Sequence, residues 1–220
     1  MLHTVITLLF FSAISQVATT FDLSTDFSLQ HNPNDVWQYG YSASNSLDPK
    51  EFRFDRYADQ AAPIGFWHPS FSKAPGPGWY PYIAHNSSKN TMFGSSNGWA
   101  ARAGEVAMEA SNTGQYSLVR FVAPMAGTYQ ISAQFEGIHF GLSSTDVHVL
   151  SNDTQLFSAD IDGYGGDPAF HKVEGASPTA AFSGKLTLKK GDIVTFAVGY
   201  GKNKTNFGDT TGLFVHIALL

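Results

Sequence analysis

The chain has 220 residues and a formal net charge of −5, and only 14% of its residues are charged. Its 13 lysines and arginines are spread thinly, which argues against nucleic acid, because neutralising phosphates needs clustered basic side chains. The lack of cysteine excludes disulfides, thiolate zinc sites, iron–sulfur clusters and a cysteine nucleophile. Aromatic residues also make up 14% of the chain, so the composition argues against disorder.

The chain begins with an apolar segment, residues 5–14, which reads VITLLFFSAI. This length suits the core of a signal peptide and is too short to span a membrane. Small residues that could form a cleavage site follow at Ala13, Ser15 and Ala18. We therefore predict a signal peptide over residues 1–18 and a secreted mature domain over residues 19–220. The alternative is an N-terminal core strand. No later segment is apolar for long enough to cross a membrane.

Alternation of apolar and polar residues dominates the rest of the chain, whereas helical periodicity is almost absent. Residues 100–110 have a helix-forming composition, but Gly104 interrupts it. Strands are expected, in chain order, at residues 21–28, 36–42, 52–57, 64–68, 115–123, 127–137, 145–150, 185–189, 193–200 and 213–220. Lys190-Gly191-Asp192 predicts a tight turn between two of them. So many short strands with Gly, Asp, Asn and Pro turns predict an all-β antiparallel two-sheet sandwich, jelly-roll-like.

Several of these segments resemble a secreted β-sandwich domain found in bacterial PEP-CTERM/exosortase-sorted extracellular proteins. The matching segments are DFSLQHNPNDVWQYGY (26–41), GQYSLVRFVAPMAGT (114–128), TDVHVL (145–150), and GDIVTFAVGYG with DTTGL (191–201 and 209–213). The resemblance implies a jelly-roll-like fold and an extracellular role, without an established activity or catalytic residues. The sequence lacks that family's C-terminal anchor, which favours a freely secreted or matrix protein.

Aromatic residues form the first candidate binding site. Flat rings stack on the apolar C–H faces of sugars, so secreted glycan binders often expose Trp and Tyr. One strand alternates Trp37, Tyr39 and Tyr41, which therefore share a face. A second group lies in or beside a loop rich in proline and glycine: Trp67, Trp79, Tyr80 and Tyr82. The alternative is that these rings belong to the core.

Polar residues on the expected central strands form the second candidate site: Arg120, Glu136, Asp146 and His148, with His139 nearby. Lined up on the open face of one sheet, they could bind sugar hydroxyls or a substrate carboxylate. The alternatives are an ion pair that fixes strand register and a simply solvated face.

A third candidate is a calcium site at Asp160, Asp162 and Asp167, where closely spaced carboxylates are accompanied by glycines. The segment lacks the full pattern of an EF-hand, so the alternative is a hairpin loop rich in turn-forming residues. Asp209 is a further possible ligand. Glycosylation sequons begin at Asn86, Asn152 and Asn203, all in turn-like contexts.

Catalytic patterns are weak. The eight histidines show no zinc-binding spacing, and no G-x-S-x-G motif occurs. Glu105, Glu109, Glu136 and Asp146 could serve a polysaccharide-active enzyme by residue type alone. The leading hypothesis is a secreted, non-catalytic module that binds extracellular carbohydrate through exposed aromatic residues. The alternatives are a structural or adhesive extracellular matrix protein and, less favoured, the enzyme.

Overall fold

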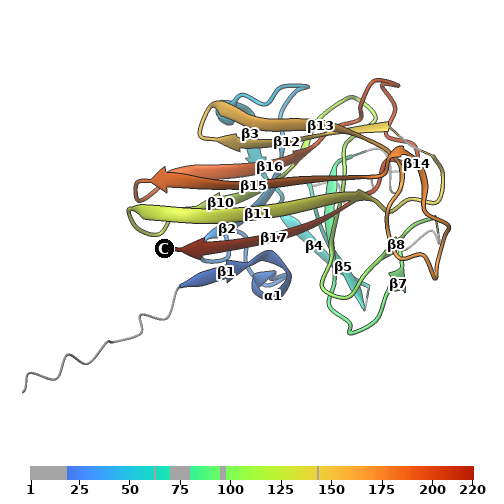
Figure 1. Cartoon of the computed structure of the whole chain (residues 1–220), viewed down its shortest axis with the longest axis horizontal. Helices are drawn as coiled ribbons and strands as arrows, with labels where there is room; N and C mark the ends of the chain where they lie inside the picture. Colours follow the sequence, from blue (N-terminus) through green and yellow to red (C-terminus); the bar gives the residue numbers. More distant parts are fainter. Residues whose placement is uncertain (1–18, 62, 70–79, 95–97, 143) are drawn as a thin grey trace, which may run out of the picture.

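The computed structural model describes residues 19–61, 63–69, 80–94, 98–142 and 144–220, and two large antiparallel sheets dominate it (Figure 1). Sheet A contains, in spatial order, β15 (Thr179–Leu188), β11 (Gly127–Gly137), β17 (Thr211–Leu219), β9 (Val106–Glu109), β6 (Tyr82–Asn86), β5 (Ile64–His68) and β4 (Tyr57–Ala61), with β1 (Thr20–Asp22) also beside β17. Sheet B contains β14 (Glu174–Ser177), β13 (Thr154–Tyr164), β12 (Ser144–Ser151), β16 (Ile193–Val198), β10 (Ser117–Val122), β2 (Trp37–Ser42) and β3 (Phe52–Phe54).

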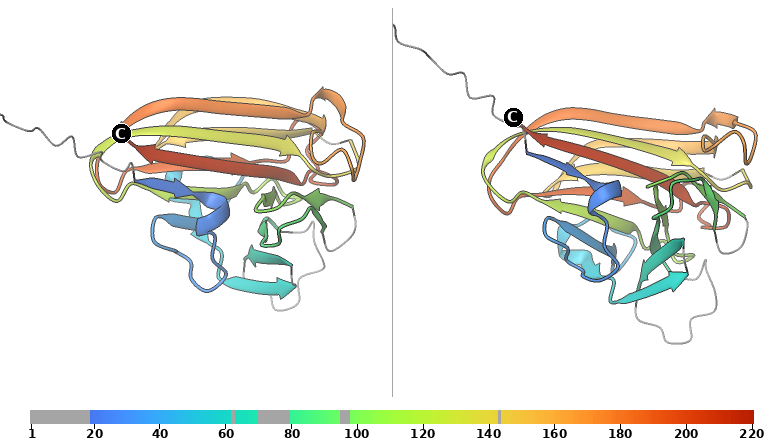
Figure 2. Two further views of the ribbon diagram at one scale, coloured as in Figure 1. Left: turned by 60° about the horizontal axis from the view of Figure 1, so that its bottom comes forward. Right: turned by 90° about the horizontal axis from the view of Figure 1, so that it is seen from below.

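The remaining described elements are short. β7 (Met92–Phe93) pairs with β8 (Ala100–Ala101), α1 spans Leu23–Asp26 and the 3-10 helix η1 spans Pro49–Glu51. The strands formed by residues 37–109 lie below the long strands of the second half in the turned views (Figure 2). Among the described residues, no helix is long and apolar enough to cross a membrane.

The order of the long strands is that of a jelly roll. Sheet A runs β15–β11–β17–β9 and sheet B runs β13–β12–β16–β10. Along the chain from β9 to β17, successive members of these eight strands alternate between the sheets, except for the hairpin β12–β13. This arrangement confirms the predicted antiparallel, jelly-roll-like sandwich. The turn at Lys190–Asp192 is also present, but it connects strands of different sheets rather than a hairpin.

The register of sheet B sends alternate residues to opposite faces. On β10, Val119 and Phe121 point into the core, whereas Arg120 between them points outward. Arg120 is paired in register with Thr195 on β16, which is itself paired with Leu150 on β12. These three side chains therefore form one row across the outer face of sheet B.

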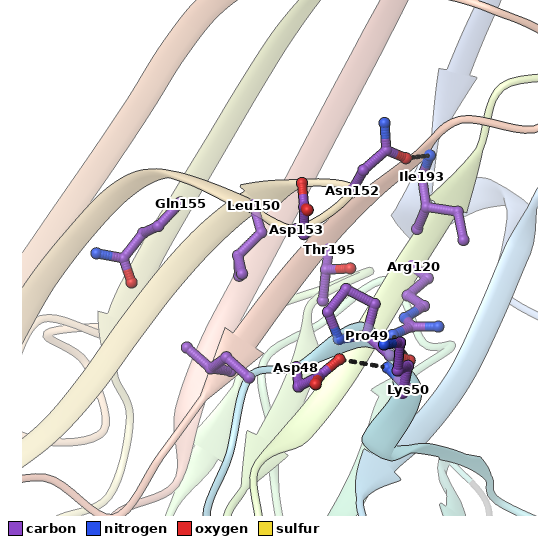
Figure 3. Close-up of a pocket in the computed structure, with 11 residues that line it drawn as sticks. Asp48, Pro49, Lys50, Arg120, Leu150, Asn152, Asp153, Gln155, Ile193 and Thr195 are labelled. Atoms are coloured by element: carbon purple, nitrogen blue, oxygen red, sulfur yellow. Dashed lines mark hydrogen bonds between the residues drawn. The ribbon is translucent and has the colours of Figure 1, made fainter.

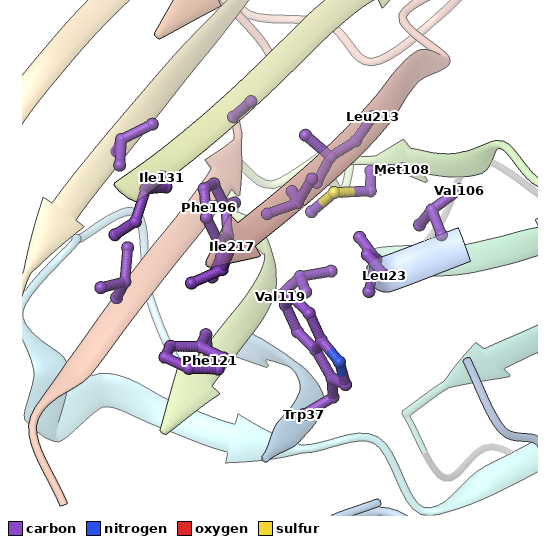
Figure 4. Close-up of a cluster of buried hydrophobic side chains, with 14 of the residues drawn as sticks. Leu23, Trp37, Val106, Met108, Val119, Phe121, Ile131, Phe196, Leu213 and Ile217 are labelled. Atoms are coloured by element: carbon purple, nitrogen blue, oxygen red, sulfur yellow. The ribbon is translucent and has the colours of Figure 1, made fainter. Parts of the chain in front are cut away.

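Large apolar side chains from both sheets fill the space between them (Figure 4). Trp37, Phe121, Phe196 and Ile217 are all fully buried there. Trp37 meets Phe121 edge-on, with ring centroids 5.6 Å apart. The core thus draws on β2, β10 and β16 of sheet B and on β17 of sheet A, so it joins segments far apart in the sequence.

Three segments show how local context decides the structure, and two of them, residues 21–28 and the aspartate-rich segment, differ from their predictions. The strand expected over residues 21–28 ends at Asp22, because the Asp22 carboxylate accepts hydrogen bonds from the backbone N–H groups of Ser24 and Thr25 and caps α1. The helix-like composition of residues 100–110 gives β8 and β9, with Gly104 between them at φ +74°. The segment expected to be an aspartate-rich loop begins as strand, because β13 continues to Tyr164.

Truncation of the core should therefore be costly. We expect Phe121→Ala to lower the free energy of unfolding by about 3–5 kcal/mol, because it leaves a cavity between the sheets. The same change at the half-exposed Phe93 should cost about 1 kcal/mol or less. Urea unfolding of the two variants measures the difference, and equal losses would contradict the assigned core.

Candidate functional site

A groove of about 740 Å³ lies on the outer face of sheet B (Figure 3). Small-molecule sites commonly enclose about 300–1,000 Å³. The groove is lined from four strands or their connections and from the η1 segment, by Leu47, Asp48, Pro49, Lys50, Arg120, Leu150, Asn152, Asp153, Gln155, Ile193 and Thr195. Its floor is the row of outward side chains described above, and its lining mixes aliphatic, amide, hydroxyl and charged groups.

Local hydrogen bonds fix two parts of the rim. The Asp48 carboxylate accepts the backbone N–H of Lys50 at 2.9 Å and caps η1. At the β12–β13 turn, the Asn152 side-chain oxygen accepts the backbone N–H of Ile193 at 2.9 Å. Both contacts are drawn in Figure 3, where Gln155 lies on the side of the groove away from Arg120. Short polar side chains that accept backbone N–H groups therefore hold these two parts of the rim.

Arg120 is the most unusual residue of this site. Only 6% of its surface is exposed. Its Nη2 donates to the Pro49 carbonyl oxygen at 3.1 Å, and its guanidinium carbon lies 3.9 Å from the centroid of the Phe52 ring. Its Nε is buried without a hydrogen-bond partner, and no carboxylate of the described residues lies within 4 Å of it. Burial lowers the pKa of Arg120 to about 10, so the side chain stays protonated at neutral pH, as a cation that has no carboxylate partner among the described residues.

A hydrogen-bonded network continues the outer face next to the groove. The Nε2 of His148 lies 2.7 Å from the Asp146 carboxylate, and its Nδ1 lies 2.9 Å from the side-chain oxygen of Gln155. The backbone N–H of Gly201 also donates to Asp146 at 2.7 Å. Although burial alone would raise the pKa of Asp146, these hydrogen bonds bring it below its usual value. The structure thus places Arg120, Asp146 and His148 on the outer face of sheet B.

Glu136, the fourth member of the predicted polar set, is elsewhere. It lies on β11 of sheet A, where it is buried and 3.2 Å from the Arg102 guanidinium. His139 is also away from this face, in the half-buried connection that follows β11. The prediction that they would line one sheet face with Arg120 was therefore wrong, because β10 and β11 belong to different sheets.

The other carboxylates that the sequence offered to an enzyme are buried too. Glu105 is fully buried, and burial followed by the neighbouring charge of Glu136 holds its pKa well above the usual value. Glu109 accepts hydrogen bonds from the hydroxyls of Tyr82 at 2.9 Å and Thr210 at 2.7 Å. None of these three glutamates lines the groove, so their arrangement gives no support to a glycosidase.

The predicted aromatic platform is largely core, which corrects the first candidate site. Trp37, Tyr39, Trp67 and Tyr82 have at most 6% of their surface exposed. The two indole nitrogens are satisfied inside the protein, by the Asp26 carboxylate at 3.1 Å for Trp37 and by the Ser28 carbonyl at 2.7 Å for Trp67. These four rings cannot stack on a ligand in this structure. The alternative stated above, that the rings fill the core, holds for them.

The remaining aromatic candidates, Tyr41, Tyr80 and Trp79, are not among these four buried rings. Tyr80 is half-buried, and its ring centroid lies 5.3 Å from that of His68. Tyr41 is also half-buried. Trp79 lies outside the described residues.

An aromatic cluster that the sequence analysis missed is more exposed. Phe93 is 49% exposed, and its ring meets Phe140 and Phe170 edge-on at 6.0 and 4.8 Å. His171 stacks on Phe140 at 5.3 Å. These rings come from β7 and from the connections after β11 and β13, so no spacing in the sequence signals their contact.

The proposed calcium ligands have no common centre. Asp160 and Asp162 are exposed on β13, and Asp160 is paired with Lys202. Asp167 instead accepts hydrogen bonds from the Thr91 hydroxyl at 2.5 Å and the Ala169 backbone N–H at 2.9 Å. Within the described ranges, no three acidic or histidine side chains gather as a metal site. Calcium stays a prediction to which this geometry gives no support.

The asparagines of the three predicted glycosylation sequons differ in their exposure to solvent. Asn86 is fully buried, and its side-chain nitrogen donates to the carbonyl oxygens of Asn90, Ala101 and Arg102 at 2.8–3.0 Å. A glycan on that nitrogen is incompatible with this structure, so the prediction for Asn86 was wrong. Asn152 and Asn203 are exposed, and glycosylation at these two positions stays a prediction.

No protein-family model and no curated protein matches the chain. Similar solved structures include a family 35 carbohydrate-binding module from Clostridium thermocellum, at 11% identity over 73% of this chain and 95% of that chain (TM-score 0.30). Another family 35 module, from an environmental isolate, is 16% identical over 63% and 91% (TM-score 0.32). Rabbit GITRL is 14% identical over 47% and 70% (TM-score 0.28).

TM-scores this low carry no argument about function. What the strand order itself establishes is the class: the chain is an all-β antiparallel sandwich of jelly-roll type. Jelly rolls serve many functions, so the functional argument rests on the groove and on Arg120.

The buried carboxyl group of Glu109 should make the stability of the fold depend on pH. Burial raises the pKa of Glu109 from 4.5 to about 7, so the folded state holds this proton more tightly than the unfolded state. The stabilisation is complete below about pH 4.5 and is lost as the pH rises through about 7. Glu109→Gln stays neutral, so its free energy of unfolding should gain up to about 3 kcal/mol relative to the native chain between about pH 5 and pH 8. Urea unfolding across that range measures this, and a pH-independent difference would contradict it.

Proposed function

We propose that this chain is a secreted, non-catalytic module that binds extracellular carbohydrate in the groove on the outer face of sheet B. The observation that carries the proposal is the buried Arg120 guanidinium, which lines the groove without a carboxylate partner among the described residues. Buried charges are normally paired, so an unpaired one in an open groove favours a ligand-binding role over a purely structural one.

The lining suits a sugar better than a purely apolar ligand. Leu47, Leu150 and Ile193 offer aliphatic surface to the C–H face of a sugar ring. Around them, the side-chain NH2 groups of Asn152 and Gln155 can donate hydrogen bonds to the hydroxyls of a saccharide, while their oxygens contact Ile193 and His148. The aromatic stacking predicted from the sequence has no part in this proposal, because the described rings among the candidates are buried or lie outside the groove.

Secretion completes the proposal and comes from the sequence. It rests on the apolar segment of residues 5–14, which lies outside the described residues. Amino-terminal sequencing of the protein recovered from a culture medium tests it, with a first residue near Thr19 as the expected result.

Filling the groove should abolish binding. Thr195 lies on its floor and is 5% exposed, so we expect Thr195→Trp to remove glycan binding on an array that includes acidic and neutral polysaccharides. Thr187→Trp makes the same change at an exposed position of β15 in sheet A and should bind like the native chain. Thermal melting shows whether each variant is folded.

A second pair of variants, with smaller changes, tests binding in the groove if Thr195→Trp does not fold. Gln155→Ala removes an exposed amide of the rim and should weaken binding several-fold, corresponding to about 1 kcal/mol. Gln130→Ala, on β11 of sheet A, should have no effect. If the native chain binds no glycan, the proposal fails and the structural or adhesive matrix alternative is favoured, with the exposed cluster around Phe93 as its first surface to test.

A further inference from the structure

We infer that the groove selects an acidic saccharide and seats its oxyanion, a carboxylate or a sulfate, on the guanidinium of Arg120. This inference rests on the proposed function and adds the chemical class of the ligand. The argument depends on which groups of the protein can neutralise Arg120, and on what else faces that end of the groove.

The protein itself supplies Arg120 with neutral contacts. One guanidinium nitrogen donates to the Pro49 carbonyl, and the ring of Phe52 covers one face of the group. Both contacts favour a cation, but neither carries a full negative charge. The side chain has nevertheless lost nearly all of its contact with water, with 6% of its surface exposed. A charge removed from water in this way interacts strongly with an anion that reaches it.

The two carboxylates that line the groove do not neutralise Arg120. Asp48 is used at the start of η1, where it accepts the backbone N–H of Lys50. Asp153 is exposed at the β12–β13 turn and lies beside the hydroxyl of Thr154. Neither is within 4 Å of Arg120, although both line the same groove. Among the described residues no carboxylate therefore neutralises Arg120, and an anion of the ligand can take that place.

A second cation lies near Arg120. Lys50 is exposed, and its backbone follows Pro49, whose carbonyl contacts Arg120 (Figure 3). The neutral amide of Gln155 lies on the side of the groove away from this pair. One end of the groove thus carries two cations, Arg120 and Lys50, beside the Asp48 carboxylate that caps η1, and the other end carries the amide of Gln155. A sugar ring with one acidic substituent and several hydroxyls has the same distribution of groups.

A guanidinium binds carboxylate and sulfate oxygens alike, through several directed N–H donors. Arg120 therefore does not by itself distinguish a carboxylated saccharide from a sulfated one. Both sources share one requirement, which is a negative charge on the saccharide. Removing that charge while keeping the sugar skeleton is therefore the decisive change to the ligand.

The experiment measures binding of the full mature chain by isothermal titration calorimetry to two matched pairs of polysaccharides. The first pair is oligogalacturonate and its fully methyl-esterified form, and the second is dextran sulfate and dextran. The protein variants are Arg120→Gln, Arg120→Lys and, as a control, Arg56→Gln, which removes an exposed arginine that does not line the groove.

We expect the native chain to bind at least one acidic member roughly 10- to 100-fold more tightly than its neutral partner, as for hydrogen bonds to charged groups. Arg120→Gln should lose that preference, Arg120→Lys should keep part of it, and Arg56→Gln should keep all of it. Added salt should weaken the acidic ligand more than the neutral one. Preference for galacturonate or for dextran sulfate would identify the source of the oxyanion.

The outcomes separate this inference from the proposed function. Equal binding of the charged and neutral members, with the groove-filling variant inactive, would overturn the inference and leave the proposed function intact. An acidic preference that survives in Arg120→Gln would also overturn it, because surface charge would then be responsible. Absence of all glycan binding would overturn both. Because Arg120 makes no ion pair with the described residues, the unliganded Arg120→Gln should melt within about 5 °C of the native chain, so the variant remains testable.

Discussion

The contact between the two sheets consists of apolar side chains pointing inward from both, and a chain without cysteine has no covalent bond to replace it. The order of the strands makes this contact inseparable from the chain path, because the long strands alternate between the sheets. Every crossing places an apolar face of one strand against an apolar face of another. The large aromatic fraction is used here: Trp37, Tyr39 and Phe121 fill the interior.

The same constraint creates the outer face on which the groove lies. A strand that sends Val119 and Phe121 inward must send Arg120 outward, and the neighbouring strands must do the same with Thr195 and Leu150. The η1 segment then covers part of this row, since the Pro49 carbonyl reaches the guanidinium. Burial of Arg120 is thus a result of a short segment placed over an otherwise open sheet.

The sequence predicted the fold class and many of the strands, because alternation is a local property of the chain. β11 and β5 match their predicted ranges, and β2 differs by one residue. It could not predict which strands share a sheet, since that depends on pairings between distant segments. For this reason Arg120 and Glu136, which both lie on confirmed strands, were wrongly expected on one face.

The prediction of an aromatic binding site was wrong for a related reason. A strand whose rings alternate looks the same whether its ring-bearing face meets solvent or another sheet, and only the second sheet buries Trp37 and Tyr39. The groove itself had a partial signal, in the polar residues of β10 and β12. Its other wall comes from η1, and nothing in residues 47–50 indicates that they lie over Arg120.

The position of β17 has a consequence for the order in which the protein can be assembled during synthesis. β17 lies between β11 and β9, and β1 pairs with it as well. Until residues 211–219 leave the ribosome, sheet A can form at most as two separate parts, β15–β11 and β9–β6–β5–β4, and β1 lacks the strand with which it pairs. Chaperones would therefore meet a chain whose other described strands are already made but whose larger sheet is still divided.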